Sequence, residues 1–242
     1  MIFKMKQWLI DLVIVLLSMF FLSTKVFPSH HINELKTIAD QGCVYSQYNL
    51  GVIYYGGIGV VPDFKEAIAW YRKAAEQDYV DAQVAIAAMY YLGKGVPQDY
   101  TLAAKWVRKA ADQNDAEAQY NLGMMYYGGQ GVQQDFSEAV EWLKKAALQD
   151  YLRALFGLGL MYYEGTGVSK NLIESAKYFK RAAGQGCADA QAILGAMYYE
   201  GHGVIQNYNE AVKWFKRSAQ QGNQEALYYL HGLCMERPSA CR

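Results

Sequence analysis

The chain has 242 residues, and its 23 Lys and Arg residues balance its 23 Asp and Glu residues, so the formal net charge is zero. Because a nucleic-acid binder concentrates positive charge against phosphates, this balance argues against nucleic acid as a partner. Hydrophobic residues make up 52% of the chain and only four residues are proline, which excludes a disordered protein. The use of 21 tyrosines and 22 glycines indicates a short pattern that is repeated.

The first 28 residues differ in composition from the rest of the chain. Lys4 and Lys6 precede an apolar run, whose uncharged stretch of 13 residues, 12–24, ends before Lys25. A membrane-spanning helix needs about 20 apolar residues, whereas a secretory signal has an apolar core of about 7–15. We therefore expect residues 1–28 to be a signal peptide or a signal-anchor. The protein is then exported (periplasmic or secreted), or anchored to a membrane through this segment alone if it is retained.

The remaining chain, residues 29–242, is dominated by a pattern with a period of 36 residues. The pair Tyr54-Tyr55 returns four times without an insertion, and the pair Ala74-Ala75 returns with it, the last time as Ser218-Ala219. Five full repeats lie near residues 39–74, 75–110, 111–146, 147–182 and 183–218, with a partial repeat over 219–235. Such a regular period is the signature of a repeat architecture.

Each period predicts a pair of helices joined by a glycine loop. In the first helix of the pair, Ala82, Ile86 and Met89 share one helical face. A Gly-x-Gly-Val loop follows, and glycine suits the end of a helix because it adopts positive φ without steric cost. With a half-repeat helix over 33–40 and a C-terminal helix over 223–235, the chain should contain twelve helices.

The second helix of each pair opens at a residue type that caps helix N-termini. These expected caps are Asp63, Asp99, Asp135, Asn171 and Asn207. A glutamate lies three positions later in every repeat but the second, where Leu102 stands, and this spacing predicts a capping box. Pairs of basic residues end the second helices, and a favourable interaction with the helix dipole explains them without a basic binding stripe.

No strand-like alternation occurs in the chain, so the sequence predicts an all-α protein. Each helix pair has an apolar face that its neighbours in the chain must cover, which is the arrangement of an α-solenoid. The expected fold is an α/α superhelical solenoid of five 36-residue helix-pair repeats, with partial repeats at both ends.

The third repeat carries the full pattern, at Ala118, Leu122, Gly123, Tyr126, Gly129, Gly131, Val132, Asp135, Ala139, Trp142, Lys145, Ala146 and Ala147. This pattern resembles the Sel1-like repeat, a tetratricopeptide-like helix pair. The resemblance implies a right-handed superhelix that acts as an adaptor in protein–protein contacts, and for exported bacterial members a role in host interaction, envelope functions or signalling. One bacterial branch, which has a cysteine pair in each repeat, is linked to β-lactam binding or hydrolysis. The present chain departs from that cysteine pattern.

The four cysteines predict one disulfide at most. Cys43 and Cys187 occupy the same repeat position four periods apart, so stacked helices hold their sulfurs on the order of tens of ångströms apart. Cys234 and Cys241 lie seven residues apart and form a possible disulfide in an exported chain. The alternative for this second pair is two free thiols.

The sequence carries no pattern typical of catalysis, metal binding or cofactor binding. The Gly-x-Gly loops follow helices rather than strands, and no G-x-x-x-x-G-K-[ST] motif is present, so phosphate binding is not expected. The acylating-serine signature Ser-x-x-Lys is also missing. We expect a protein that is not an enzyme and that holds neither a metal nor a cofactor.

The candidate binding residues lie on the side of the first helices opposite to their buried face. Positions equivalent to 84, 85 and 88 vary between repeats, as a recognition surface does, whereas structural positions keep one residue type. Aromatic rings beside carboxamides suit an extended peptide, because an amide can bond its backbone. The groove candidates are Tyr48, Asn49, Tyr120, Asn121, Met124, Phe156 and Tyr228. For the position of Tyr48 and its equivalents, the alternative is a place in the core against the neighbouring repeat.

Together these observations favour an exported scaffold or adaptor that binds a protein or peptide in the concave groove of its repeats. The alternative is an envelope enzyme, or a binder of peptidoglycan fragments or β-lactams, for which only the family resemblance speaks. Self-association is a third possibility, because each end of a solenoid leaves a stacking face uncovered.

Overall fold

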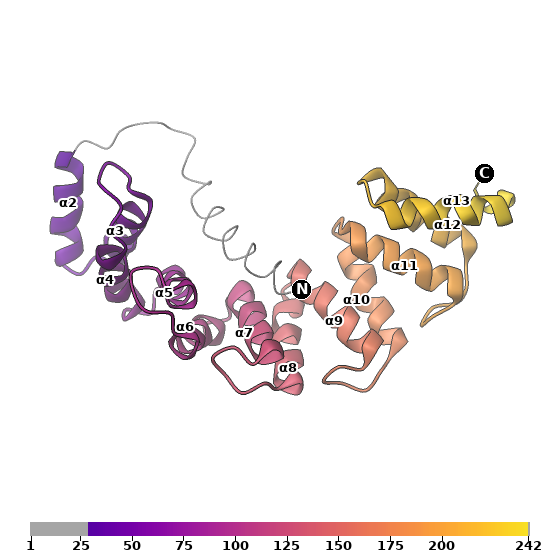
Figure 1. Ribbon diagram of the computed structural model, residues 1–242, viewed down its shortest axis with the longest axis horizontal. Helices are drawn as coiled ribbons and strands as arrows, with labels where there is room; N and C mark the ends of the chain where they lie inside the picture. Colours follow the sequence, from indigo (N-terminus) through magenta and orange to yellow (C-terminus); the bar gives the residue numbers. More distant parts are fainter. Residues whose placement is uncertain (1–28, 242) are drawn as a thin grey trace. The chain divides into compact units, whose positions relative to one another are not determined.

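The computed structural model describes residues 29–241 of the chain. Over this range it contains twelve α-helices, one short 3₁₀ helix and no strand, which confirms the expected all-α fold (Figure 1). The segment 1–28, expected to be a signal peptide or anchor, lies outside the described residues.

The helices alternate between two kinds, which we call first helices and second helices after their order in the repeat. The first helices are α3 (Val44–Gly56), α5 (Val80–Leu92), α7 (Ala116–Gly128), α9 (Leu152–Glu164), α11 (Ala188–Glu200) and α13 (Gln224–Glu236). The second helices are α2 (Ser29–Asp40), α4 (Phe64–Ala75), α6 (Tyr100–Asp112), α8 (Phe136–Leu148), α10 (Leu172–Gly184) and α12 (Tyr208–Gln220). The 3₁₀ helix η1 (Pro238–Ala240) follows α13.

The helices form two compact units. Of the described residues, the N-terminal unit comprises 29–118 together with Gln130–Val132, and the C-terminal unit comprises Gln119–Gly129 together with 133–241. Within each unit, helices that are consecutive in the chain pack against one another, as α3 does on α4 and α11 on α12. This nearest-neighbour packing is the organisation of a solenoid.

The five predicted N-caps of the second helices are confirmed. Oδ1 of Asp63 accepts hydrogen bonds from the backbone N–H groups of Lys65 and Glu66, at 2.9 and 3.0 Å. The capping box itself is only half formed, because the N–H of Asp63 donates to the carbonyl of Tyr54 at 2.9 Å. The carboxylate of Glu66 is then free to accept from Nε1 of Trp70, at 3.1 Å.

The two glycines of each loop have different tasks. Gly93 ends α5 in the left-handed region, with φ 68°, and its N–H donates to the carbonyl of Met89. Gly95 lies against the backbone of Phe64, at the start of the second helix of the preceding repeat, where any side chain would clash. The first glycine therefore makes the turn, and the second allows two repeats to approach closely.

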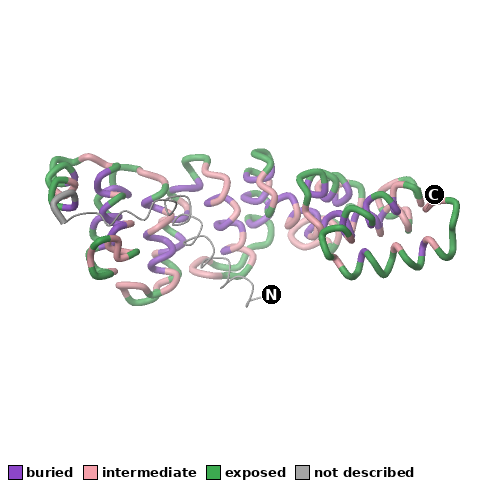
Figure 2. Tube along the Cα trace, turned by 90° about the horizontal axis from the view of Figure 1, so that it is seen from above, coloured by how far each residue is buried: buried purple, intermediate pink, exposed green. Residues whose placement is uncertain are grey.

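Buried residues recur along the helices of each unit, between half-buried and exposed ones (Figure 2). In the C-terminal unit the core contains Leu158 and the ring of Phe179, which are both fully buried. At Gly159 the first helix lies so close to this ring that an added Cβ would be 2.7 Å from Cε1 of Phe179. Glycine at the equivalent of Gly159 thus sets how closely the first and second helices of a repeat pack.

Candidate functional site

One side of the first helices is partly open to solvent. Ala82, Ile86 and Met89 are buried, as predicted for the core side of α5. On the opposite side, residues at positions equivalent to 81, 84, 85, 88 and 92 are mostly half-buried or exposed. We call the residues at these positions in all first helices the first-helix face.

In the N-terminal unit, α3 brings Tyr48 and Asn49 to this face. The ring of Tyr48 packs against Tyr71 of α4 and against Tyr79, with centroids 5.6 and 5.1 Å apart. This burial raises the pKa of Tyr48 to about 12. Asn49 is exposed, and so is Tyr45, one turn earlier, which keeps 65% of its surface open. The amide of Asn49 and the ring of Tyr45 are therefore available for contact.

In the C-terminal unit, α7 carries three of the candidates. The ring of Tyr120 lies 5.4 Å from that of Tyr151 and is half-buried, and burial raises the pKa of its hydroxyl. Asn121 is 9% exposed, and its Oδ1 has no hydrogen-bond partner among the described residues. Met124 is half-buried beside them on the same helix. Asn121 is thus less accessible than the equivalent Asn49.

The two remaining candidates differ in exposure. Phe156 of α9 packs edge-on against Phe179, with ring centroids 5.7 Å apart, and is half-buried. Tyr228 of α13 is 77% exposed. At this repeat position, therefore, Tyr48 and Phe156 pack against a ring of a second helix and Tyr120 packs against Tyr151, whereas Tyr228 is open.

Sequence reasoning missed a buried glutamine at the junction of the repeats. Nε2 of Gln83 donates to the carbonyl of Ala75 at 3.2 Å, and Oε1 of the same residue accepts from Gln113 at 2.9 Å. The carbonyl of Ala75 lies at the end of the preceding second helix and also accepts from the N–H of Asp78 at 3.1 Å, so the glutamine supplies its second donor. Gln47 and Gln191 make the same bonds, so the recurrence of glutamine every 36 residues was the signal.

The fourth repeat has a different solution at this junction. Leu155 stands where the glutamine is expected and cannot donate a hydrogen bond. Arg181 of α10 replaces it, because its Nη2 donates to the carbonyl of Ala147 at 2.6 Å and to Oδ1 of Asp150 at 2.7 Å. In both solutions a side chain donates to the carbonyl at the end of the preceding second helix. The donor is the glutamine of the first helix in one case and Arg181 of the following second helix in the other.

The basic residues at the ends of the second helices also cover aromatic rings. Nζ of Lys73 lies 3.7 Å from the ring centroid of Trp70, and Nζ of Lys145 lies 3.5 Å from that of Trp142. The guanidinium of Arg217 lies 4.8 Å from Trp214 in the same way. These contacts give the basic residues a structural role besides their interaction with the helix dipole.

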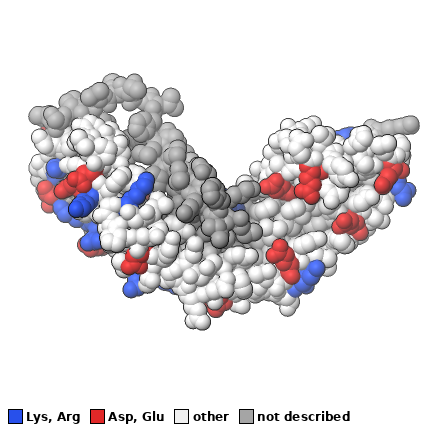
Figure 3. All heavy atoms as spheres, viewed as in Figure 1, with Lys and Arg blue, Asp and Glu red and all other residues white. Residues whose placement is uncertain are grey.

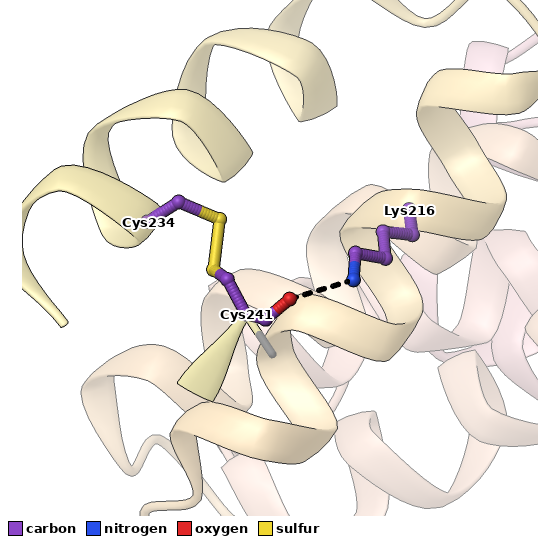
Figure 4. Close-up of a disulfide and its surroundings, with 3 residues drawn as sticks. All are labelled: Lys216, Cys234 and Cys241. Atoms are coloured by element: carbon purple, nitrogen blue, oxygen red, sulfur yellow. Dashed lines mark hydrogen bonds between the residues drawn. A yellow bond between two sulfur atoms is a disulfide. The ribbon is translucent and has the colours of Figure 1, made fainter. Parts of the chain in front are cut away.

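A disulfide joins Cys234 of α13 to Cys241, with Cα atoms 5.6 Å apart (Figure 4). Nζ of Lys216 donates to the carbonyl of Cys241 at 3.3 Å and so ties the C-terminal turn to α12. Cys43 and Cys187 are free thiols.

No group of three or more His, Cys, Asp or Glu side chains within residues 29–241 is arranged to hold a metal ion. No helix in the same range is both long and apolar enough to cross a membrane.

A family model described as Sel1 repeat matches five consecutive segments of the chain, at residues 44–79, 80–115, 116–151, 152–187 and 188–223. Each matched segment begins at or beside the start of a first helix and includes the second helix that follows. Comparison with curated protein sequences gives no match.

Two solved structures share both sequence and fold with the chain. One is a protective antigen of uropathogenic Escherichia coli strains that displays an SLR fold, with 38% identity and a TM-score of 0.81 over 85% of this chain. The chain spans 44% of that protein's length. The other is a Sel1 repeat protein from Oxalobacter formigenes, with 35% identity and a TM-score of 0.68, which covers 80% of this chain and 77% of its own.

Proposed function

Since this chain belongs to the Sel1 repeat family, whose repeats are in general scaffolds for protein–protein interaction, we propose that its first-helix face binds a polypeptide segment of a partner protein. The observation that carries the proposal is the contrast between the two sides of the first helices. The core side repeats the same small and apolar residues, whereas the first-helix face changes from repeat to repeat and keeps aromatic and amide groups at the surface.

The accessible groups suit a polypeptide ligand. The exposed amide of Asn49 has a donor and an acceptor, which match a peptide carbonyl and N–H. The exposed ring of Tyr228 offers a large rigid surface that loses little conformational entropy on binding. Nothing in the described residues favours the alternative of an envelope enzyme or a β-lactam binder.

The test compares two pairs of substitutions at exposed positions. Asn49→Ala with Tyr228→Ala removes two exposed groups from the first-helix face. Leu148→Ala with Ile173→Ala removes two exposed apolar side chains, 80% and 60% open, from the second helices and their ends. Both pairs should keep the helical circular dichroism of the wild type, because all four side chains are exposed.

The readout is capture of a crosslinked partner by immobilised protein, identified by mass spectrometry. We expect the same partner to be captured by the wild type and by the Leu148/Ile173 variant, and to be lost from the Asn49/Tyr228 variant. Equal capture by both variants would show that the first-helix face does not carry the interaction.

We also propose that the protein is exported, on the basis of the signal-like residues 1–28, and the cysteine pair Cys234–Cys241 supports this. Disulfides persist in oxidising compartments and are rare in the cytosol. Cell fractionation with thiol labelling tests the proposal, since an exported chain should leave two labelled thiols, Cys43 and Cys187. Recovery of the chain in the cytosol with four reactive thiols would refute it.

A further inference from the structure

Charge is divided unevenly between the two kinds of helix, although the chain as a whole is neutral. Among the second helices, α4, α6, α8, α10 and α12 carry 14 Lys and Arg against six Asp and Glu, while α2 carries one Lys against one Asp and one Glu. The six first helices carry seven Asp and Glu against the single base Arg153. The neutral net charge of the chain therefore combines an excess of basic residues on these second helices with an excess of acidic residues on the first helices.

Acidic residues lie at both ends of the first-helix face on α11 and α13, whereas on α9 Glu164 lies at one end and Arg153 at the other. On the first-helix face of α11, Asp189 and Glu200 lie on either side of the half-buried Ile193 along the helix. On the same face of α13, Glu225 and Glu236 lie on either side of Tyr229. Each carboxylate is exposed. Because a helix rises about 1.5 Å per residue, the two carboxylates of each helix lie about 16 Å apart, with apolar surface between them. Across neighbouring helices they form two acidic rows, one at the helix starts (Asp189 and Glu225) and one at the helix ends (Glu164, Glu200 and Glu236). Figure 3 shows carboxylates predominating on the visible face of this unit.

The pairing of these carboxylates differs from that on the second helices. In the C-terminal unit Glu141, Glu174 and Glu210 of the second helices each bond the lysine three residues later, at 2.8, 2.6 and 3.1 Å. Among the described residues, no lysine or arginine forms an ion pair with an acidic residue of α9, α11 or α13. Glu200 pairs with His202 and Glu236 accepts from the hydroxyl of Tyr199 at 3.1 Å.

The acidic row at the helix ends lies where a negative charge lowers the stability of the helix that carries it. Glu164, Glu200 and Glu236 are the last residues of α9, α11 and α13, where the helix dipole is negative and a carboxylate is destabilising. The earlier first helices end in Gly56, Leu92 and Gly128 instead, so the repeat does not require an acid there. Residues that oppose the stability of their own helix are expected at functional positions.

We propose that the first-helix face of the C-terminal unit binds a basic polypeptide segment with apolar residues between its charges, which rests on the function proposed above. Packed helices lie about 8–10 Å apart, and an extended chain advances about 3.3 Å per residue. A segment that crosses α9, α11 and α13 thus meets one carboxylate of the row at about every third residue. Its apolar side chains contact Tyr229 and the exposed ring of Tyr228.

The test uses fluorescence anisotropy with the purified full-length chain and a labelled synthetic peptide of about ten residues, with arginine at every third position and leucine or alanine between. The test variant is Glu164→Gln, Glu200→Gln and Glu236→Gln together. The control variant is Glu141→Gln, Glu174→Gln and Glu210→Gln, which changes the charge equally on the second helices.

We expect the test variant to bind the peptide about tenfold more weakly than the wild type, and the control variant to bind it within about twofold. The melting temperature of the test variant should rise, because three unfavourable charges leave helix ends, so weaker binding will not reflect unfolding. Equal weakening in both variants, or equal affinity for the same peptide with glutamate in place of arginine, would overturn the inference.

Three further outcomes show whether this inference, the proposed function or both fail. If a peptide with glutamine in place of arginine binds as tightly and Tyr228→Ala weakens it, the basic character of the partner is wrong and the first-helix face remains the binding site. If no peptide depends on first-helix residues, both ideas fail. If sedimentation shows wild-type oligomers that the test variant loses, the occupant is a second copy of the chain through its basic second helices, and the inference is overturned.

Discussion

Substituting Gly159 by alanine tests the packing that positions the first-helix face. Two effects oppose each other. Alanine favours a helix interior over glycine by about 1 kcal/mol. The new Cβ, however, would lie 2.7, 2.8 and 2.9 Å from three ring atoms of Phe179, and that ring is fully buried and cannot swing into solvent.

Overpacking of this kind costs about 1–3 kcal/mol, so we expect Gly159→Ala to lower the free energy of unfolding by about 1 kcal/mol in balance. The second repeat supplies the rescue, because it has Ala87 in place of glycine and Val107 in place of the aromatic ring. Phe179→Val alone should destabilise by about 2–4 kcal/mol through the cavity it leaves. The double variant should then be more stable than the sum of the two changes by about 1–3 kcal/mol.

Urea unfolding followed by circular dichroism measures these differences. Gly184→Ala is the control for an unhindered substitution, because Gly184 is the last residue of α10 and an added Cβ there meets no atom within 4 Å. That control should report the helix preference alone and stabilise the chain. The reasoning is refuted if Gly159→Ala stabilises as much as Gly184→Ala, or if the Gly159 and Phe179 changes are additive.

Three other predictions follow from single contacts. Gln191→Leu removes one of the two donors to the carbonyl of Ala183, which also accepts from the N–H of Gly186 at 3.1 Å, and should destabilise the protein by about 1 kcal/mol in the same unfolding assay. Cys234→Ser opens the short loop closed with Cys241 and should lower stability by about 2 kcal/mol, seen as a lower melting temperature that reducing agent does not change further. Burial raises the pKa of the Tyr48 hydroxyl to about 12, whereas in the unfolded chain the hydroxyl loses its proton near pH 10. The free energy of unfolding should therefore fall as the pH rises from about 10 to 12. Urea unfolding measured across that pH range tests the direction.

The sequence allowed the repeat fold to be predicted, because its signals are local and recur five times. The caps at Asp63 and its equivalents follow from residue type and position alone, and the structure confirms them. The second half of the capping box failed for a reason that position cannot reveal. The competing acceptor, the carbonyl of Tyr54, belongs to the preceding helix and comes close only after the loop has folded.

The candidate binding residues were less predictable than the fold. A helical pattern shows which side of α7 Asn121 is on, but its burial depends on how neighbouring helices pack, and it is less exposed than Asn49 at the same repeat position. The acidic residues of the face were invisible to a search for varied aromatic and amide positions. Whether an acidic residue has a basic partner depends on the folded structure. The glutamates of the second helices form ion pairs with lysines, and this difference from the first helices is visible only there.

The arginine that replaces a glutamine in the fourth repeat restricts how this chain can recombine. Leu155 and Arg181 lie within one matched segment, 152–187. In the preceding segment Arg181 bonds the backbone carbonyl of Ala147, a group that every residue has, and the carboxylate of Asp150. Duplication or exchange of the whole segment therefore carries the donor for this carbonyl to any new neighbour. A crossover between Leu155 and Arg181 can produce a hybrid repeat with neither donor, so viable exchanges in such genes should have their boundaries between repeats rather than within them.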